Sequence, residues 1–184
     1  MDDHDEQVQR AVDIALHGDV SSAPDSAVFF AGKKSNMREA VRLCTSDESG
    51  ELTTLLHTDA YKQLKEIPLY GHDAPFTPEE SFDITGAVSA RFAQEASGNV
   101  TVFVEKLSKR STFFTVELPA LLLNDDVETI NNEDKMSWLR YVQPPILPQT
   151  DIIPPERLRF DTSSLDSMGQ HDGGYHQSDD ELTF

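Results

Sequence analysis

The sequence predicts a single soluble α/β domain, in which a small, mostly parallel sheet is flanked by helices. Two observations indicate this fold class. Segments typical of strands and helices alternate between residues 27 and 104, as a parallel sheet requires, because helices usually connect its strands. The charge is also distributed unevenly along the chain. This distribution indicates a domain at residues 27–142, preceded by an acidic segment, residues 1–26, and followed by a tail, residues 143–184.

Both ends of the chain are strongly acidic. Residues 1–26 hold seven acids and one base, and residues 143–184 hold eight acids and two bases, so each end carries −6 of the total charge of −18. The like charges within such a segment repel one another, so the segment remains in contact with water. The tail is rich in proline over residues 144–155, and residues 161–184 contain six acids and no base. We therefore predict that the tail is extended and then disordered.

The first predicted elements are a helix and a strand. Val8, Val12 and Ala15 form one apolar stripe, which predicts a short helix over residues 5–17. Residues 27–30 (AVFF) form a short apolar run between turn signals. Such a run is typical of a buried strand.

Two helices are predicted next. Apolar residues recur at helical spacing over residues 36–44, with Ser35 or Asn36 as the expected N-cap. Thr58 is the expected cap of a short helix that continues to about Lys65.

The clearest helix start is at Thr77. Pro78 occupies the first helical position and Glu80 follows Thr77 by three residues, which is the pattern of a capping box. We predict a helix over residues 77–97. One face of this helix is expected to carry Phe82, Val88 or Ser89, Phe92 and Ala96.

Two further strands are predicted at residues 100–104 and 113–117, joined by a basic turn that contains Lys106, Lys109 and Arg110. A last helix is predicted over residues 133–142. Gly32 and Glu117 then both lie at the ends of predicted strands. Ligands of parallel sheets bind beyond the carboxyl ends of the strands, so we expect a site there.

The composition disfavours several classes of function. Nucleic-acid binding relies on Lys and Arg that neutralise phosphates, and this chain has 15 such residues against 33 acids. The six histidines are scattered without the spacing of metal ligands, so we expect no metal. The expected partner is a small molecule, and the acidic ends could also bind a protein.

The chain contains one cysteine, Cys44, which excludes an intrachain disulfide and is expected to be a small buried side chain. The first ten residues lack the basic start and apolar core of a signal peptide. No apolar run approaches the roughly 20 residues that cross a bilayer. We expect a cytoplasmic protein, with export by a signal-independent route left open.

Three motifs follow one another between residues 27 and 127. They are residues 28–32 (VFFAG), residues 88–100 (VSARFAQEASGNV) and residues 111–121 (STFFTVELPAL). In order and spacing they resemble segments of the ADP-ribosyl cyclase and NAD glycohydrolase family, whose microbial branches also lack disulfides. The resemblance implies a cyclase-like fold.

The resemblance also implies an enzyme that breaks the bond between nicotinamide and ribose in NAD, which is its substrate, without a further cofactor. Glu117 matches the catalytic glutamate, and a carboxylate suits the oxocarbenium-like ribose that nicotinamide leaves behind. Capture of that ribose by water gives ADP-ribose. Capture by the adenine ring gives cyclic ADP-ribose.

The motifs also imply substrate-binding residues. Phe30 matches an aromatic position on the nicotinamide side, and Ser89 matches a helix hydroxyl that faces the pocket. Three residues ahead of Glu117 match positions that contact the phosphates or the ribose, and these are Ser111, Thr112 and Phe113. Gly32, which follows the first predicted strand, is also expected at the site.

The chain departs from the family pattern at three positions. Thr85 stands where the family has its second tryptophan, Leu56 where many members have an acid, and Ala31 where they have a serine. An alternative is therefore a degenerate cyclase-like protein that binds a nucleotide or a protein without chemistry. A further alternative is an acidic interaction protein whose ends carry the function, with Glu117 a solvated carboxylate.

Overall fold

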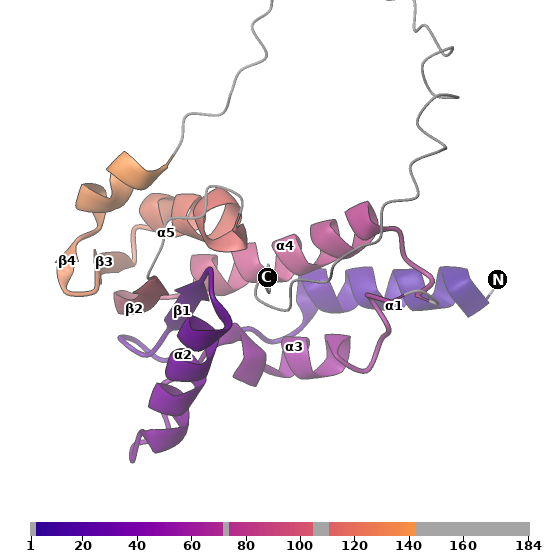
Figure 1. Cartoon of the computed structure of the whole chain (residues 1–184), viewed down its shortest axis with the longest axis horizontal. Helices are drawn as coiled ribbons and strands as arrows, with labels where there is room; N and C mark the ends of the chain where they lie inside the picture. The colour runs from indigo at the N-terminus through magenta and orange to yellow at the C-terminus, as the bar shows by residue number, and fades with distance from the viewer. Residues whose placement is uncertain (1–2, 72–73, 105–110, 143–184) are drawn as a thin grey trace, which may run out of the picture. The chain divides into compact units, whose positions relative to one another are not determined.

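The computed structural model describes residues 3–71, 74–104 and 111–142 (Figure 1). The predicted tail and the basic turn with Lys106, Lys109 and Arg110 lie outside the described residues. Among those described, no helix is both long and apolar enough to cross a membrane.

A four-stranded sheet in the order β1-β2-β3-β4 lies at the centre of the fold. Strand β1 (Val28–Ala31) pairs in parallel with β2 (Gly98–Val104), and β2 pairs in parallel with β3 (Val127–Ile130). Strand β4 (Glu133–Asp134) is antiparallel to β3. This sheet, with its helices, confirms the predicted α/β class, although β3 was not predicted.

Helices pack against both faces of the sheet. On β1, Phe29 joins the large apolar core with Phe92, and its neighbour Val28 joins a smaller cluster with Ala40 and Cys44. Successive side chains of a strand point to opposite faces, so the large core and the smaller cluster lie on opposite sides of the sheet. Helix α2 (Lys34–Ser46) covers the smaller cluster. Cys44 is buried as predicted.

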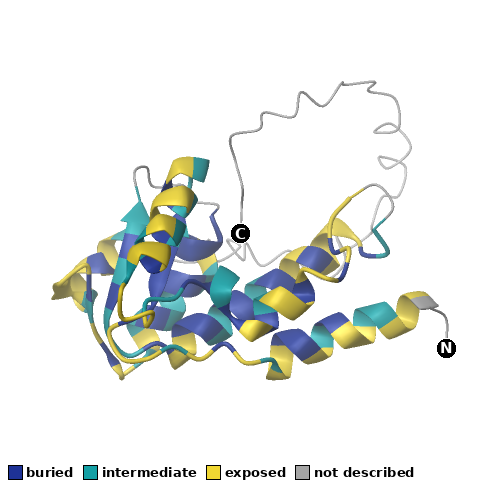
Figure 2. Ribbon diagram, turned by 90° about the horizontal axis from the view of Figure 1, so that it is seen from below, coloured by how far each residue is buried: buried dark blue, intermediate teal, exposed yellow. Residues whose placement is uncertain are grey.

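The large core lies between the sheet and the remaining helices. These are α1 (Asp3–His17), α3 (Asp59–Leu64), α4 (Pro78–Glu95) and α5 (Leu118–Leu123). Figure 2 shows buried residues along the inner sides of these helices and exposed residues along their outer sides. Phe29 packs against Phe92 with ring centroids 4.9 Å apart and the ring planes inclined at 45°, which joins α4 directly to β1.

The two helix starts that were predicted from capping residues at Thr58 and Thr77 are confirmed. The Thr58 hydroxyl accepts a hydrogen bond from the Tyr61 backbone N–H at the start of α3. At the start of α4, the Thr77 hydroxyl accepts a hydrogen bond from the Glu80 backbone N–H at 3.2 Å. The Glu80 carboxylate accepts one from the Thr77 backbone N–H at 2.8 Å. The start of α2 differs from the prediction, because the N-cap is Lys33. The Asn36 side chain instead donates to the Ala31 carbonyl, at 2.5 Å.

The prediction of a strand at residues 113–117 is wrong. This segment is a π-helical turn, η2 (Phe113–Glu117), that continues directly into α5. Periodicity alone does not separate a short apolar strand from a buried helix, and Pro119 suits the first turn of a helix. The Thr115 N–H donates to the Ser111 carbonyl at 3.1 Å, which is helical pairing. Glu117 therefore does not lie at a strand end.

Two smaller predictions also differ. Residues 133–142 form β4 and a 3₁₀ helix, η3 (Lys135–Tyr141), in place of one α-helix. Asn131 and Asn132 both have positive φ in the tight turn before β4, a conformation that asparagine tolerates. Phe82 is 47% exposed, so it does not belong to the buried face of α4.

Candidate functional site

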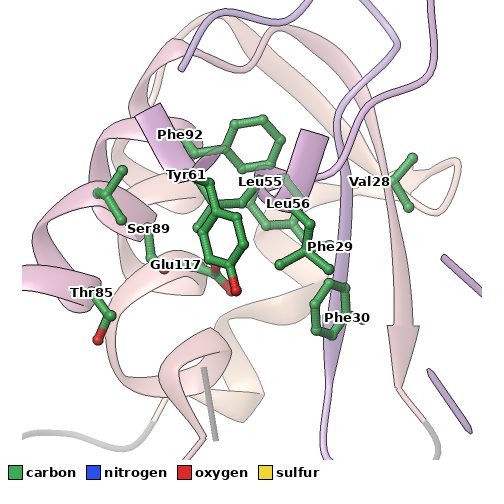
Figure 3. Close-up of a pocket in the computed structure, with 11 residues that line it drawn as sticks. Val28, Phe29, Phe30, Leu55, Leu56, Tyr61, Thr85, Ser89, Phe92 and Glu117 are labelled. Atoms are coloured by element: carbon green, nitrogen blue, oxygen red, sulfur yellow. The ribbon is translucent and has the colours of Figure 1, made fainter. Parts of the chain in front are cut away.

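A small cavity lies where α4, η2 and β1 meet the segment before α3 (Figure 3). Its volume is about 20 Å³, which is room for about one water molecule. Most of the lining is apolar. The lining residues are Val28, Phe29, Phe30, Leu55, Leu56, Tyr61, Thr85, Val88, Ser89, Phe92 and Glu117.

Glu117 is the acidic residue of this lining. It lies at the end of η2, where its side chain is only 7% exposed. Removal from water raises the pKa of the Glu117 carboxyl to about 8, although a hydrogen bond with the Ser89 side chain lowers it. Burial disfavours the charged form of an acid, so Glu117 is mostly protonated at neutral pH.

Helix α4 supplies one wall of the cavity. Thr85, Val88, Ser89 and Phe92 are spaced at three- and four-residue intervals, so they share one face of the helix. The capping box at Thr77 fixes where this helix begins. Ser89 lies on this face and makes a hydrogen bond with Glu117.

Tyr61 is a cavity residue that sequence reasoning missed. It belongs to α3, and its ring lies among the side chains that line the cavity (Figure 3). Burial, together with nearby Tyr70, raises the pKa of the Tyr61 hydroxyl. No sequence signal identified this tyrosine, because its place depends on how α3 packs.

The structure brings together three of the predicted site residues. Phe30, Ser89 and Glu117, which come from β1, α4 and η2, all line the cavity. The carboxylate is buried rather than in open solvent.

The other four predicted site residues lie elsewhere in the described part of the chain. Gly32 follows β1 with a positive φ of 84° and does not line the cavity. Phe113 is fully buried and packs edge-on against Phe114 at a centroid distance of 5.0 Å, within the core. Ser111 and Thr112 are buried at the entry to η2. Their contacts with a substrate remain predictions.

Two of the three departures from the family pattern also line the cavity. Leu56 lies near Phe30 in Figure 3, where many family members are expected to have an acid. The Thr85 hydroxyl lies 3.0 Å from the Tyr70 hydroxyl and donates to the Ser81 carbonyl at 2.9 Å. The third departure, Ala31, is buried in β1 and is not a lining residue.

The site offers little to a metal ion. Within residues 3–71, 74–104 and 111–142, no group of three His, Cys, Asp or Glu side chains is arranged to bind one. The described lining also includes no lysine, arginine or histidine. Its chemistry is therefore that of one carboxyl group surrounded by hydroxyls, aliphatic side chains and aromatic rings.

No family model and no curated protein matches the chain, but several solved structures are similar to it. One is an ADP ribosyl cyclase complexed with N1-cIDPR, with 18% identity and a TM-score of 0.45 over 59% of this chain and 48% of that one. Another is porcine CD38 with a covalent intermediate, ribo-F-ribose-5'-phosphate, with 20% identity and a TM-score of 0.46 over 68% and 67% of the two chains.

A third is Aplysia cyclase complexed with substrate NGD and product cGDPR, with 15% identity and a TM-score of 0.46 over 69% and 61% of the two chains. The chain thus spans 48% of the length of the first of these proteins. The likeness concerns the fold alone.

Proposed function

We propose that the protein cleaves NAD at the bond between nicotinamide and ribose, with Glu117 as the catalytic residue. The observation that carries this proposal is the buried carboxyl of Glu117 in a cavity with aromatic walls. The motifs around Phe30, Ser89 and Glu117 add support, since these three residues converge on the same cavity although they are far apart in the sequence.

The chemistry follows from the charge of the substrate. When the glycosidic bond breaks, its electron pair goes to the ring nitrogen, so nicotinamide leaves as a neutral molecule and the ribose carries the positive charge. An ionised Glu117 stabilises that charge at short range, and the apolar surroundings strengthen the attraction. Water then adds to the ribose carbon and loses a proton, which gives ADP-ribose.

The ionised form must be reached from a mostly protonated carboxyl. The nicotinamide ring of NAD is a cation, and a nearby opposite charge lowers the pKa of an acid. Bound NAD therefore shifts Glu117 toward the carboxylate that the reaction needs. The hydrogen bond with Ser89 acts in the same direction.

Binding requires the cavity to open, because a volume of about 20 Å³ does not hold a nicotinamide ring. The half-buried side chains of Phe30, Leu56 and Tyr61 lie at the lining and partly reach solvent. We infer that rotation of these side chains opens the cavity to the ring.

The test is incubation of the purified full chain with NAD, followed by chromatography of the products. We expect release of nicotinamide with ADP-ribose or its cyclic form, and loss of this release in Glu117→Gln. Circular dichroism of the variant verifies that it is folded. Nicotinamide release no faster than in Glu117→Gln would reject the enzymatic proposal.

A second candidate is binding of a nucleotide without cleavage. Leu56 and Thr85 favour it, because both line the cavity at positions where the family pattern has an acid and a tryptophan. Calorimetric titration with NAD and ADP-ribose separates the two candidates. Tight binding without product formation would support the second one.

A further inference from the structure

Helix α2 is a basic segment in an acidic chain. Residues 33–46 hold four bases and one acid, a net charge of +3, whereas the whole chain carries −18. Lys33 is the N-cap of α2, and the first turn of the helix contains no acid. Positive charges at this end oppose the helix dipole, so their placement does not stabilise the helix. Such a cluster of bases is suited to an anionic partner.

An open groove of about 470 Å³ runs along one side of α2. In the described part of the chain, its lining residues all belong to this helix, and they are Met37, Arg38, Val41, Arg42, Thr45 and Ser46. Met37 and Val41 are half-buried, whereas Arg38 and Arg42 are exposed. Residues four apart lie on the same side of a helix, so an apolar row and a basic row run side by side along the groove.

The two arginines of the groove can receive further carboxylates. Arg42 contacts Glu39 at 2.6 Å, but both side chains are at least half exposed, and exposed ion pairs contribute little. Among the described residues, no carboxylate pairs with Arg38. Asp47, the acid that follows the helix, accepts hydrogen bonds from backbone N–H groups of its own loop. The basic row is therefore only partly neutralised by these neighbours.

A segment of complementary composition occurs in the sequence outside the described residues. Residues 178–184 (SDDELTF) contain three consecutive acids, followed by a leucine and a phenylalanine, and no base. Residues 151–160 also contain two acids, but two bases balance them. Carboxylates bind arginine through short, charge-assisted hydrogen bonds, and large apolar side chains suit an apolar row. Residues 178–184 therefore match both rows of the groove.

We propose that residues 178–184 of the same chain bind in the groove of α2. Their carboxylates lie against Arg38 and Arg42, and their apolar side chains lie against the neighbouring apolar row. The total charge of −18 repels acidic segments of other proteins. The chain's own segment overcomes this repulsion through its high effective concentration.

The connection to this segment is long enough. Residues 143–177, a stretch of 35 residues, separate the segment from the end of the described part. Fully extended, such a stretch spans about 115 Å, which exceeds the diameter of a domain of this size. The groove is therefore within reach wherever it lies on the domain.

The first test uses the full chain with its three acids neutralised, as Asp179→Asn, Asp180→Asn and Glu181→Gln together. We expect the backbone amide NMR signals of α2 to differ between this neutralised chain and the unmodified chain, and those of β3 to stay in place. Unchanged signals of α2 would overturn the inference. Signals of the unmodified chain that change on about tenfold dilution would assign the segment to a second copy, which would also overturn it.

The second test measures binding of a fluorescent peptide with the sequence of residues 178–184. We expect it to bind the neutralised chain about tenfold more tightly than the unmodified chain, whose own segment competes for the groove. In the neutralised chain, Arg38→Gln with Arg42→Gln should weaken peptide binding at least about tenfold. Arg10→Gln with Lys62→Gln is the matched control, because it removes the same charge from exposed positions of α1 and α3.

Thermal unfolding of each variant verifies that it is folded. Equal affinity of the peptide for the neutralised and unmodified chains would overturn the inference, and this comparison leaves α2 unchanged. Equal effects of the arginine pair and the control pair would show attraction without a groove and would overturn it as well. None of these measurements depends on cleavage of NAD.

Discussion

Glu117→Gln is expected to stabilise the folded protein at neutral and alkaline pH, because it replaces an ionisable buried group by a neutral one of similar shape. Burial raises the pKa of Glu117 from 4.5 to about 8. The folded protein therefore holds this proton more tightly than the unfolded chain. The resulting contribution to the free energy of unfolding is complete below about pH 4.5 and is lost as the pH rises to about 8.

The size of the effect follows from the two pKa values. Each unit of difference corresponds to about 1.4 kcal/mol, and pH 7 lies about 2.5 units above the unfolded value, so the loss at pH 7 is about 3 kcal/mol. Above pH 8 the whole difference of about 3.5 units applies, and the loss reaches about 5 kcal/mol. Glu117→Gln has no such loss.

Urea denaturation at about pH 5, 7 and 9, followed by circular dichroism, measures the difference between the two proteins. We expect the advantage of Glu117→Gln to grow by several kcal/mol across this range. Glu128→Gln, at an exposed position of β3, is the matched control. If Glu117→Gln and the unmodified protein lost stability in parallel as the pH rose, Glu117 would not be the buried acid described above.

Three further outcomes are expected. Under the proposed function, the ionised form of Glu117 in the free enzyme is the active one, so kcat/KM for NAD should rise about tenfold per pH unit up to about pH 8 and then level off; a flat profile between about pH 5 and 8 would contradict this. Ser89→Ala removes the hydrogen bond that lowers the pKa of Glu117, so the same profile should move to higher pH, and a shift to lower pH would be incompatible with the site. Thr77→Ala should lower the free energy of unfolding by about 1 kcal/mol in urea denaturation, whereas Thr77→Ser, which retains the capping hydroxyl, should change it little.

The elements that the sequence predicts best are those determined by local chemistry. The start of α4 depends on three neighbouring residues, Thr77, Pro78 and Glu80, which make their contacts with one another. By contrast, the segment at residues 113–117 has the same short apolar pattern in a strand and in a helix. Its helical form is stabilised by burial of Phe113 in the core, a contact with Phe29 and Trp138 that comes from distant parts of the chain.

The same distinction applies to the candidate site. Phe30, Ser89 and Glu117 could be named in advance because each lies in a motif, and the structure places all three around one cavity. Tyr61 could not be named, since nothing next to it in the sequence indicates a site. Its position depends on the packing of α3, in which Ala60 lies so close to Gly18 that a side chain on Gly18 would collide with it.

The energetics of Glu117 link the cavity to the charge of its ligand. Ionisation of Glu117 costs about 5 kcal/mol more in the folded protein than in the unfolded chain. A buried acid of this kind is normally compensated by a basic partner, and the described lining contains none. A cationic ligand would supply the missing charge, and its attraction to the carboxylate would offset part of that cost. Under the proposed function, the positive charge passes from nicotinamide to the ribose as the bond breaks, so the same carboxylate would remain compensated. A neutral ligand would bring no such compensation, so the burial of this one acid favours a cationic ligand over a neutral one.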